Sequence, residues 1–128
     1  MPIKFKVIQR SQPGVAGGGN KKFYASPNMS GEKNLTDLTT QIEKISTVSG
    51  ADIRAVLYAL SDVIKTNLVN GEIVRLGDLG SLRVSFSSEG KDKAEDISSA
   101  NIKDTKVIFT PSKEIKDALS LATFEKIK

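Results

Sequence analysis

The residues best able to do chemistry in this sequence are arginines and lysines, and the chemistry open to them is the binding of anions. Arg75 and Arg83 stand near the two ends of the stretch VRLGDLGSLR, residues 74–83. Gly77 and Gly80 predict a tight turn in this stretch, because glycine tolerates backbone angles that a β-carbon forbids. The flanking residues alternate as strands do, so the two arginines are expected to face outward. Four apolar residues are expected to face a core: Val74, Leu76, Leu79 and Leu82.

The 128 residues include no cysteine and no histidine. This excludes disulfides, thiolate and imidazole catalysis, and nearly all transition-metal sites. Asp92, Glu95 and Asp96 could in principle bind a cation, but carboxylates on a polar stretch are typical of a solvated surface. We therefore expect a protein that is not an enzyme and that holds no metal or cofactor.

The net charge of +4 is unevenly distributed along the chain. Residues 1–34 hold six Lys or Arg against one Glu, and residues 105–128 hold five Lys against three acidic residues. Residues 85–104 reverse the sign, with three Lys against five Asp or Glu. A basic excess suits a nucleic-acid partner, although a charged patch is more often only a solvated surface.

The N-terminal residues predict a β-hairpin. Residues 2–8 alternate apolar and basic side chains, which is typical of a strand with one wet face, and residues 21–26 are its candidate partner. The stretch GVAGGGNKK between and after them superficially resembles a phosphate-binding loop. It lacks Gly-Lys-Ser/Thr and no helical pattern follows it, so a flexible hairpin loop is favoured. No apolar run suits a signal peptide or a membrane span, and a cytoplasmic location is expected.

Two helices are predicted in the next part of the chain. Asn34 and Ser49 are each followed three residues later by Asp, which is a helix-start signal. Apolar residues then recur at helical spacing to Ile45 in the first helix, and over residues 53–68 in the second, which ends at Asn70-Gly71. The short connection makes them a helical hairpin or V.

Strands are predicted on both sides of the glycine turn, over Ile73–Leu76 and Leu82–Phe86. Periodicity then stops, so residues 87–101 are expected to form a long exposed loop or a projecting arm. Residues Ile102–Phe109 resume the strand pattern.

The C-terminal part of the chain predicts one more helix. Thr110-Pro111 would supply its cap and first-turn proline, and apolar residues between Ile115 and Ala122 would form its inner face. A short final strand is expected around Phe124 and Ile127.

This order of elements resembles the histone-like HU/IHF family. Residues 71–84, GEIVRLGDLGSLRV, are similar to the family's strand-turn-strand signature, with Leu79 and Leu82 where phenylalanines are usual. Residues 107–119, VIFTPSKEIKDAL, are similar to its closing segment, with Ser112 in place of glycine. The likeness covers about residues 34–121, and the additional ends resemble an extended, Bacteroidetes-type variant of the family.

The resemblance implies an α+β, IHF-like fold that forms an intertwined homodimer. A helical base would carry an antiparallel β saddle and a C-terminal helix, with residues 1–33 as a basic β extension and residues 34–128 as the HU/IHF-like domain. The wide apolar stripe of the second helix supports a dimer, because one small chain cannot cover it.

The same resemblance implies a site for double-stranded DNA on the saddle. Its candidate contact residues are Arg75, Ser81, Arg83, Lys106, Lys113 and Lys116, arranged about Gly77 and Gly80. For the lysines, a solvated helix face is an equally good interpretation. For the arginines, the alternative is cross-strand pairing with Glu72 or Asp104, worth up to about 1 kcal/mol.

The arm departs from the family pattern. Residues 87–101 contain no proline and no arginine, and their net charge is negative, so arm-driven wrapping of DNA is not expected. The leading hypothesis is a nucleoid-associated, histone-like protein that binds duplex DNA without sequence specificity and bends it little. The alternative is a structural or protein-interaction module on the same scaffold, with the acidic arm facing a basic partner.

Overall fold

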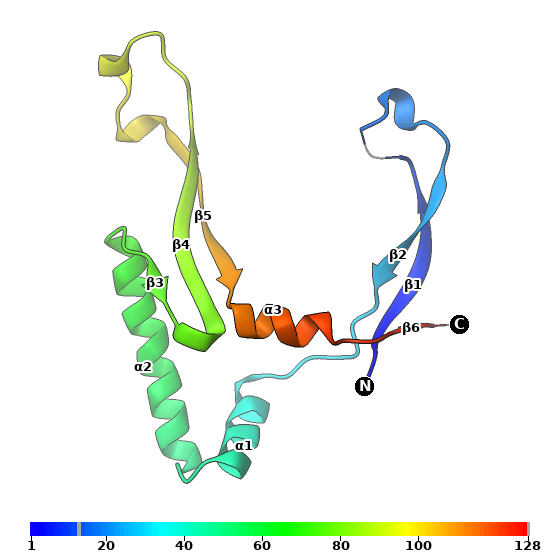
Figure 1. The fold of residues 1–128 in the computed structure, drawn as a ribbon. Coiled ribbons are helices and arrows are strands. Elements are labelled where there is room, and N and C mark those ends of the chain that lie inside the picture. The colour runs from blue at the N-terminus through cyan, green and yellow to red at the C-terminus, as the bar shows by residue number, and fades with distance from the viewer. Residues whose placement is uncertain (13, 128) are drawn as a thin grey trace.

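Over the part that the structure describes, the chain folds into an α+β structure with three α-helices and two three-stranded sheets (Figure 1). A computed structural model describes residues 1–12 and 14–127. The elements are β1 (Ile3–Arg10), β2 (Lys22–Pro27), α1 (Leu35–Ile45), α2 (Gly50–Val69), β3 (Val74–Arg75), β4 (Gly80–Ser88), β5 (Ile102–Pro111), α3 (Lys113–Ser120) and β6 (Phe124–Lys126). The arm formed by β4 and β5 and the hairpin formed by β1 and β2 rise on the same side of α3 (Figure 1).

Both predicted helix starts are confirmed by their caps. The side chain of Asn34 accepts a hydrogen bond from the amide of Asp37, whose carboxylate accepts one from the amide of Asn34. The side chain of Ser49 caps α2 by accepting a hydrogen bond from the amide of Asp52. The helix ends at Asn70, and Gly71 follows with a φ of +81°, a conformation that favours glycine.

The sheet that follows has the strand order β3-β4-β5 and is antiparallel throughout. Val74, Leu82 and Val84 share one face of the sheet and are half-buried, and both β3 and β4 contact α2. The predicted arm is confirmed as a projecting hairpin: β4 and β5 extend to its tip, where two 3₁₀ turns, Ala94–Asp96 and Ser99–Asn101, complete it (Figure 1).

The second sheet has the order β2-β1-β6 and joins both ends of the described chain. The predicted N-terminal hairpin is confirmed, with β1 and β2 antiparallel. The predicted final strand is confirmed as β6, which pairs with β1 in parallel through Ile3, Lys4 and Phe5.

Two predictions about the region around the turn are wrong. Alternation predicts Leu79 in the core, yet it is 54% exposed, because residues Gly77–Leu79 form a 3₁₀ turn that breaks the strand pattern. Thr110-Pro111 does not start the last helix. Pro111 instead ends β5, where a missing N–H is tolerated, and Ser112 caps α3 by accepting a hydrogen bond from the amide of Ile115 at 3.2 Å.

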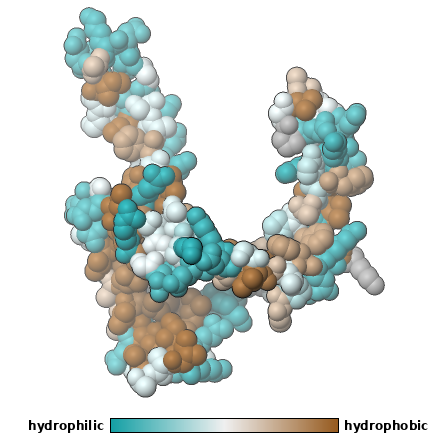
Figure 2. Space-filling model, in the orientation of Figure 1, coloured by the Kyte–Doolittle hydropathy of each residue, from teal (hydrophilic) through white to brown (hydrophobic). Residues whose placement is uncertain are grey.

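The described chain leaves most of its apolar residues open to solvent. Ile53 is the one buried apolar side chain among the described residues, while Val56 and Val63 of α2 are 63% and 55% exposed. The accessible surface is 10487 Å², whereas a folded monomer of this mass exposes about 6,600 Å². Apolar residues gather over the helical base, and the tip of the arm is hydrophilic (Figure 2).

None of the helices described is both long enough and apolar enough to span a bilayer.

Candidate nucleic-acid interface

The glycine turn sets the geometry of this region. Gly77 and Gly80 have φ angles of +62° and +136°, which L side chains rarely adopt. A β-carbon on Gly80 would also overlap the carbonyl oxygen of Thr110 on β5. The amide of Leu76 donates to the carbonyl of Gly80 at 2.8 Å and closes the turn. The turn therefore places Arg75 of β3 directly opposite Ser81 of β4.

Ser112 connects the turn to α3. Its amide donates to the carbonyl of Leu79 at 3.3 Å, and its hydroxyl donates to the carbonyl of Asp78. Because Ser112 also caps α3, the helix begins beside the turn and brings Lys113 with it. One surface hollow is lined by Arg75, Gly77, Gly80, Ser81, Thr110, Pro111, Ser112 and Lys113. Three of the six predicted DNA-binding residues, and both glycines, thus meet at one place.

The strand register brings four of the predicted contact residues onto one face of the sheet. They are Arg75 of β3, Ser81 and Arg83 of β4, and Lys106 of β5. Ser81 pairs with Arg75 on one side and with Thr110 on the other. Since side chains in a strand alternate between faces, Arg83 lies on the same face two residues along β4. Lys106 pairs with Ser85, the next residue of that face. We call this surface, made by Arg75, Ser81, Thr110, Arg83, Ile108, Ser85 and Lys106, the basic face.

A β-bulge adds a further lysine to the basic face. Ser85 pairs with Lys106, but Ser87 pairs with Lys103, so two residues of β5 oppose Phe86 alone. Asp104 takes up the extra residue with a φ of +55°. Without the bulge, strict alternation would put Asp104 at the position that Lys103 occupies opposite Ser87. The sequence prediction missed Lys103 because the alternation of side chains does not reveal where a bulge falls.

The expected cross-strand pairing of the arginines is not found among the described residues. Arg83 lies opposite Ile108, and Asp104 accepts a hydrogen bond from the hydroxyl of Ser87 at 2.9 Å. Within residues 1–12 and 14–127, no ion pair engages the cations of the basic face. All of these arginine and lysine side chains are exposed. They are therefore available to an external anion.

The two lysines of α3 differ in their surroundings. Lys113 forms an ion pair with Asp117, one helical turn along, at 3.6 Å, with 90% of the lysine side chain exposed. Such an exposed pair contributes at most about 0.5 kcal/mol and exchanges easily for another anion. Lys116 is exposed and lies one turn further from the glycine turn, so it extends the basic region along α3.

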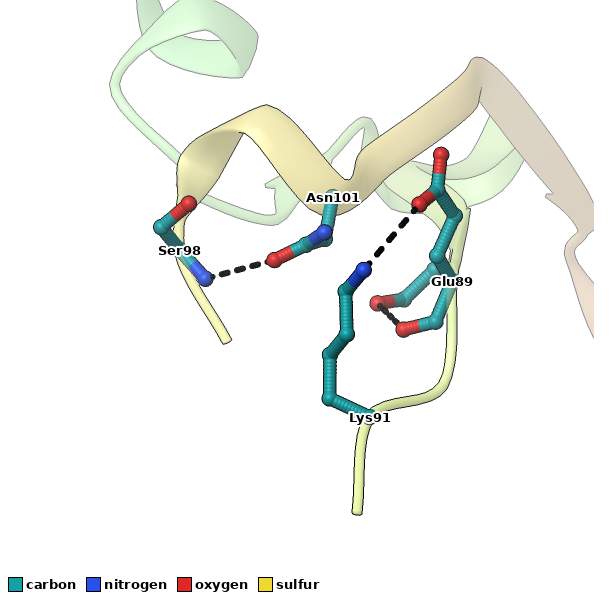
Figure 3. Close-up of polar contacts among 5 residues, drawn as sticks. Glu89, Lys91, Ser98 and Asn101 are labelled. Atoms are coloured by element: carbon teal, nitrogen blue, oxygen red, sulfur yellow. Dashed lines mark hydrogen bonds and ion pairs between the residues drawn. The ribbon is translucent and has the colours of Figure 1, made fainter. Parts of the chain in front are cut away.

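The tip of the arm is ordered by its own polar contacts (Figure 3). The side chain of Asn101 is buried and accepts a hydrogen bond from the amide of Ser98 at 2.8 Å. The amide of Glu89 donates to the carbonyl of Asn101. The Lys91 ammonium lies 3.9 Å from the Glu89 carboxylate (Figure 3). Residues 87–101 carry four acidic residues against two lysines, so the tip is negative where the stem is positive.

Two further features of the tip bear on its chemistry. The apolar residue Ile97 is 46% exposed and comes directly after Glu95 and Asp96. The sequence prediction overlooked it. Asp92, Glu95 and Asp96 are the carboxylates that could in principle bind a cation. In the part of the chain that the structure describes, they do not gather into a group that could hold a metal ion.

Comparison with known proteins identifies the family. A family model for HU-HIG, described as an HU domain fused to a wHTH, Ig or glycine-rich motif, matches residues 1–126. The fold is similar to the crystal structure of a protein from Bacteroides vulgatus ATCC 8482, provisionally named a bacterial DNA binding protein, with a TM-score of 0.67 and 14% sequence identity. That match covers 98% of this chain and 48% of the other, so the chain spans about half the length of the solved protein.

No curated protein matches the sequence. The family model nevertheless runs from residue 1 to residue 126 and so includes the strands that form the second sheet. It also contains the two segments, residues 71–84 and 107–119, on which the resemblance to HU/IHF was predicted. That prediction is confirmed: the chain belongs to the HU-HIG family of HU-like proteins.

Proposed function

We propose that this chain is a histone-like protein that binds duplex DNA through its phosphates, with little preference for sequence. The basic face would lie against the sugar-phosphate backbone, with Arg75 and Arg83 as the principal contacts. Ser81 would donate a hydrogen bond to a phosphate beside the turn. Lys106, Lys103, Lys113 and Lys116 would add further neutralising charges. A location with the nucleoid in the cytoplasm follows from this proposal.

The observation that carries the proposal is the register of β3, β4 and β5. It collects Arg75, Arg83 and Lys106 on one face, and none of the paired positions on that face holds a carboxylate. Apart from Ile108, which lies opposite Arg83, the apolar residues Val74, Leu82, Val84, Val107 and Phe109 of these strands lie on the opposite face. Such a segregated cationic surface attracts a polyanion, and its contacts read backbone rather than bases.

We further propose that the functional form is an intertwined homodimer. The chain exposes about 3,900 Å² more than a compact monomer of its mass, well above the roughly 800 Å² that each partner buries in a standard interface. The exposed apolar residues of α1 and α2, among them Leu38, Val56 and Val63, supply a surface that a second copy would cover. Two basic faces would then stand side by side as a saddle.

The acidic tip supports a second, weaker candidate, a protein-interaction module that uses residues 87–101 to contact a basic partner. Its ordered turns and its negative charge favour a specific surface. A pull-down with and without nuclease distinguishes the two candidates. A protein that stays bound to this chain after nuclease treatment would support the interaction module, and a protein that is lost would support DNA binding.

The test is a mobility-shift or anisotropy titration of the full chain with several unrelated duplexes over a salt series. Phosphate neutralisation predicts similar affinities for all of the duplexes. It also predicts a steep fall in affinity as salt rises, with a slope in log–log form of about −0.9 for each phosphate neutralised. Absence of binding at low salt would overturn the proposal.

A further inference from the structure

The sheet formed by β2, β1 and β6 has two chemically different faces. Alternation along β1 puts Ile3, Phe5 and Val7 on one face, where the register adds Phe124, Pro27 and Ala25. The opposite face carries the basic residues of the hairpin. These are Lys4, Lys6 and Arg10 of β1 and Lys22 of β2, and we call them the hairpin cluster.

The hairpin cluster holds several positive charges close together on one face of the sheet. Arg10 and Lys22 are directly opposite one another in the antiparallel register, an arrangement of like charges that destabilises a sheet. Lys4 and Lys6 are on the same face of one strand, and such positions repeat at about 6.6 Å. An anion that bridges these cations would convert the repulsion into attraction.

Few carboxylates lie near enough to neutralise the positive charge of the hairpin cluster. At the register positions of this face, Glu125 of β6 is the one acidic residue, opposite Lys4, and no ion pair joins it to the cluster within the described residues. The Arg10 guanidinium instead lies over the ring of Tyr24, 4.6 Å from its centroid. That cation–π contact holds the guanidinium near the ring without using its N–H groups, which can still donate to an external acceptor.

The position of the sheet indicates which polyanion can reach the hairpin cluster. The β1–β2 hairpin rises from the far end of α3, on the same side of the helix as the arm that carries the basic face (Figure 1). The helix that carries Lys113 and Lys116, α3, lies between the two (Figure 1). A duplex lying on the basic face would therefore pass α3 and meet the hairpin if it continued in that direction.

We propose that the hairpin cluster is a second phosphate-binding surface, which holds the flanking part of the same DNA duplex that the basic face binds. This inference rests on the proposed function and extends it to a longer footprint. The other face of the sheet is mainly apolar, with Lys126 of β6 beside Phe5 as a charged residue at its edge, and it serves chiefly to position the cluster.

The experiment compares the full chain with K4Q/K6Q/K22Q, which leaves the stacked Arg10 in place. The matched control is K33Q/K44Q/K65Q, which removes the same number of charges from the linker, α1 and α2. Salt series on a long duplex should show a slope for the hairpin variant that is shallower by about 0.9 for each phosphate left without its cation, hence by roughly 2 to 3 per chain. The control should keep the slope of the unmodified chain. Hydroxyl-radical footprints should shorten at the flanks and keep the centre.

Equal slopes and equal footprints for the hairpin variant and its control would overturn the inference. The charge-preserving K4R/K6R/K22R should restore both readouts, and circular dichroism melts would show that each variant is folded. Failure of the unmodified chain to bind any duplex would overturn the proposed function and this inference together. Binding whose slope falls in R75Q/R83Q/K106Q but not in the hairpin variant would overturn the inference alone.

Discussion

At the scale of single residues, Gly80 governs the geometry of the candidate interface most directly. Its φ of +136° and its contact with the Thr110 carbonyl leave no space for a β-carbon. Because Gly80 begins β4, a shift there would move Ser81 away from Arg75 and disturb the whole basic face. Ser112 caps α3 and donates hydrogen bonds to the carbonyls of Asp78 and Leu79, so the position of α3 also depends on the geometry of this turn.

Substitution of Gly80 tests this dependence. Gly80→Ala should lower the free energy of unfolding by roughly 2 to 5 kcal/mol, because backbone strain and steric overlap add. The matched control is Gly90→Ala in the arm, where no atom lies within 4 Å of the new β-carbon and φ is not positive. It should change stability by less than about 0.5 kcal/mol in the same chemical denaturation experiment. Similar losses for both variants would contradict the role given to Gly80.

The residues that the sequence predicts well are those whose local chemistry decides their place. Asn34, Ser49 and Gly71 mark helix ends because caps and positive φ angles depend on near neighbours only. Sequence patterns place Leu79 and Pro111 wrongly and miss Lys103. Leu79 lies in a 3₁₀ turn, and Pro111 lies in a strand that runs two residues beyond its apolar pattern. Lys103 reaches the basic face because of the bulge opposite Phe86. The turn is a local break in the strand alternation, and the longer strand and the bulge arise from the pairing of β4 with β5. The spacing of apolar residues along one segment contains neither signal.

At the scale of elements, the arm is a single hairpin with two electrostatic parts. The stem of β4 and β5 carries Arg83, Lys106 and Lys103, whereas the tip is acidic and closed by its own hydrogen bonds. An apolar residue, Ile97, is exposed at the tip, but it directly follows Glu95 and Asp96. Phosphate repels these carboxylates, so the tip is poorly suited to enter the minor groove of a duplex.

The arm therefore predicts little bending of bound DNA. Energy transfer between dyes at the two ends of a duplex should change only slightly when the protein saturates it. Ile97→Ala should leave that signal and the affinity unchanged, since no wedge is removed. A large rise in transfer that Ile97→Ala abolishes would show that the tip intercalates despite its charge.

At the scale of the whole molecule, the extended U shape leaves a single chain without a sufficient core. The fold class was predictable from the order of helices and strands, and the wide stripe on α2 favours a dimer. The pairing of β6 with β1 was less accessible, because contacts between the two ends of a chain leave no local pattern. The same pairing brings the basic hairpin to the end of α3.

A homodimer makes a quantitative prediction about mass and stability. Sedimentation equilibrium should give about twice the chain mass of 13.8 kDa, and the melting temperature should rise with protein concentration. Val56→Asp, at an exposed apolar position of α2, should dissociate the dimer, while Ser30→Asp in the linker should not. A folded species of single-chain mass with a concentration-independent melting temperature would contradict the dimer.

The most direct test of the central claim is the salt dependence of duplex binding by R75Q/R83Q/K106Q, measured beside the control K33Q/K44Q/K65Q. If the basic face holds the phosphates, the slope of log affinity against log salt becomes shallower by about 0.9 for each phosphate that is no longer neutralised, roughly 2 to 3 per chain. The control, from which the same charge is removed elsewhere, keeps the slope of the unmodified chain. Equal slopes for the two variants would contradict the claim that this face binds DNA.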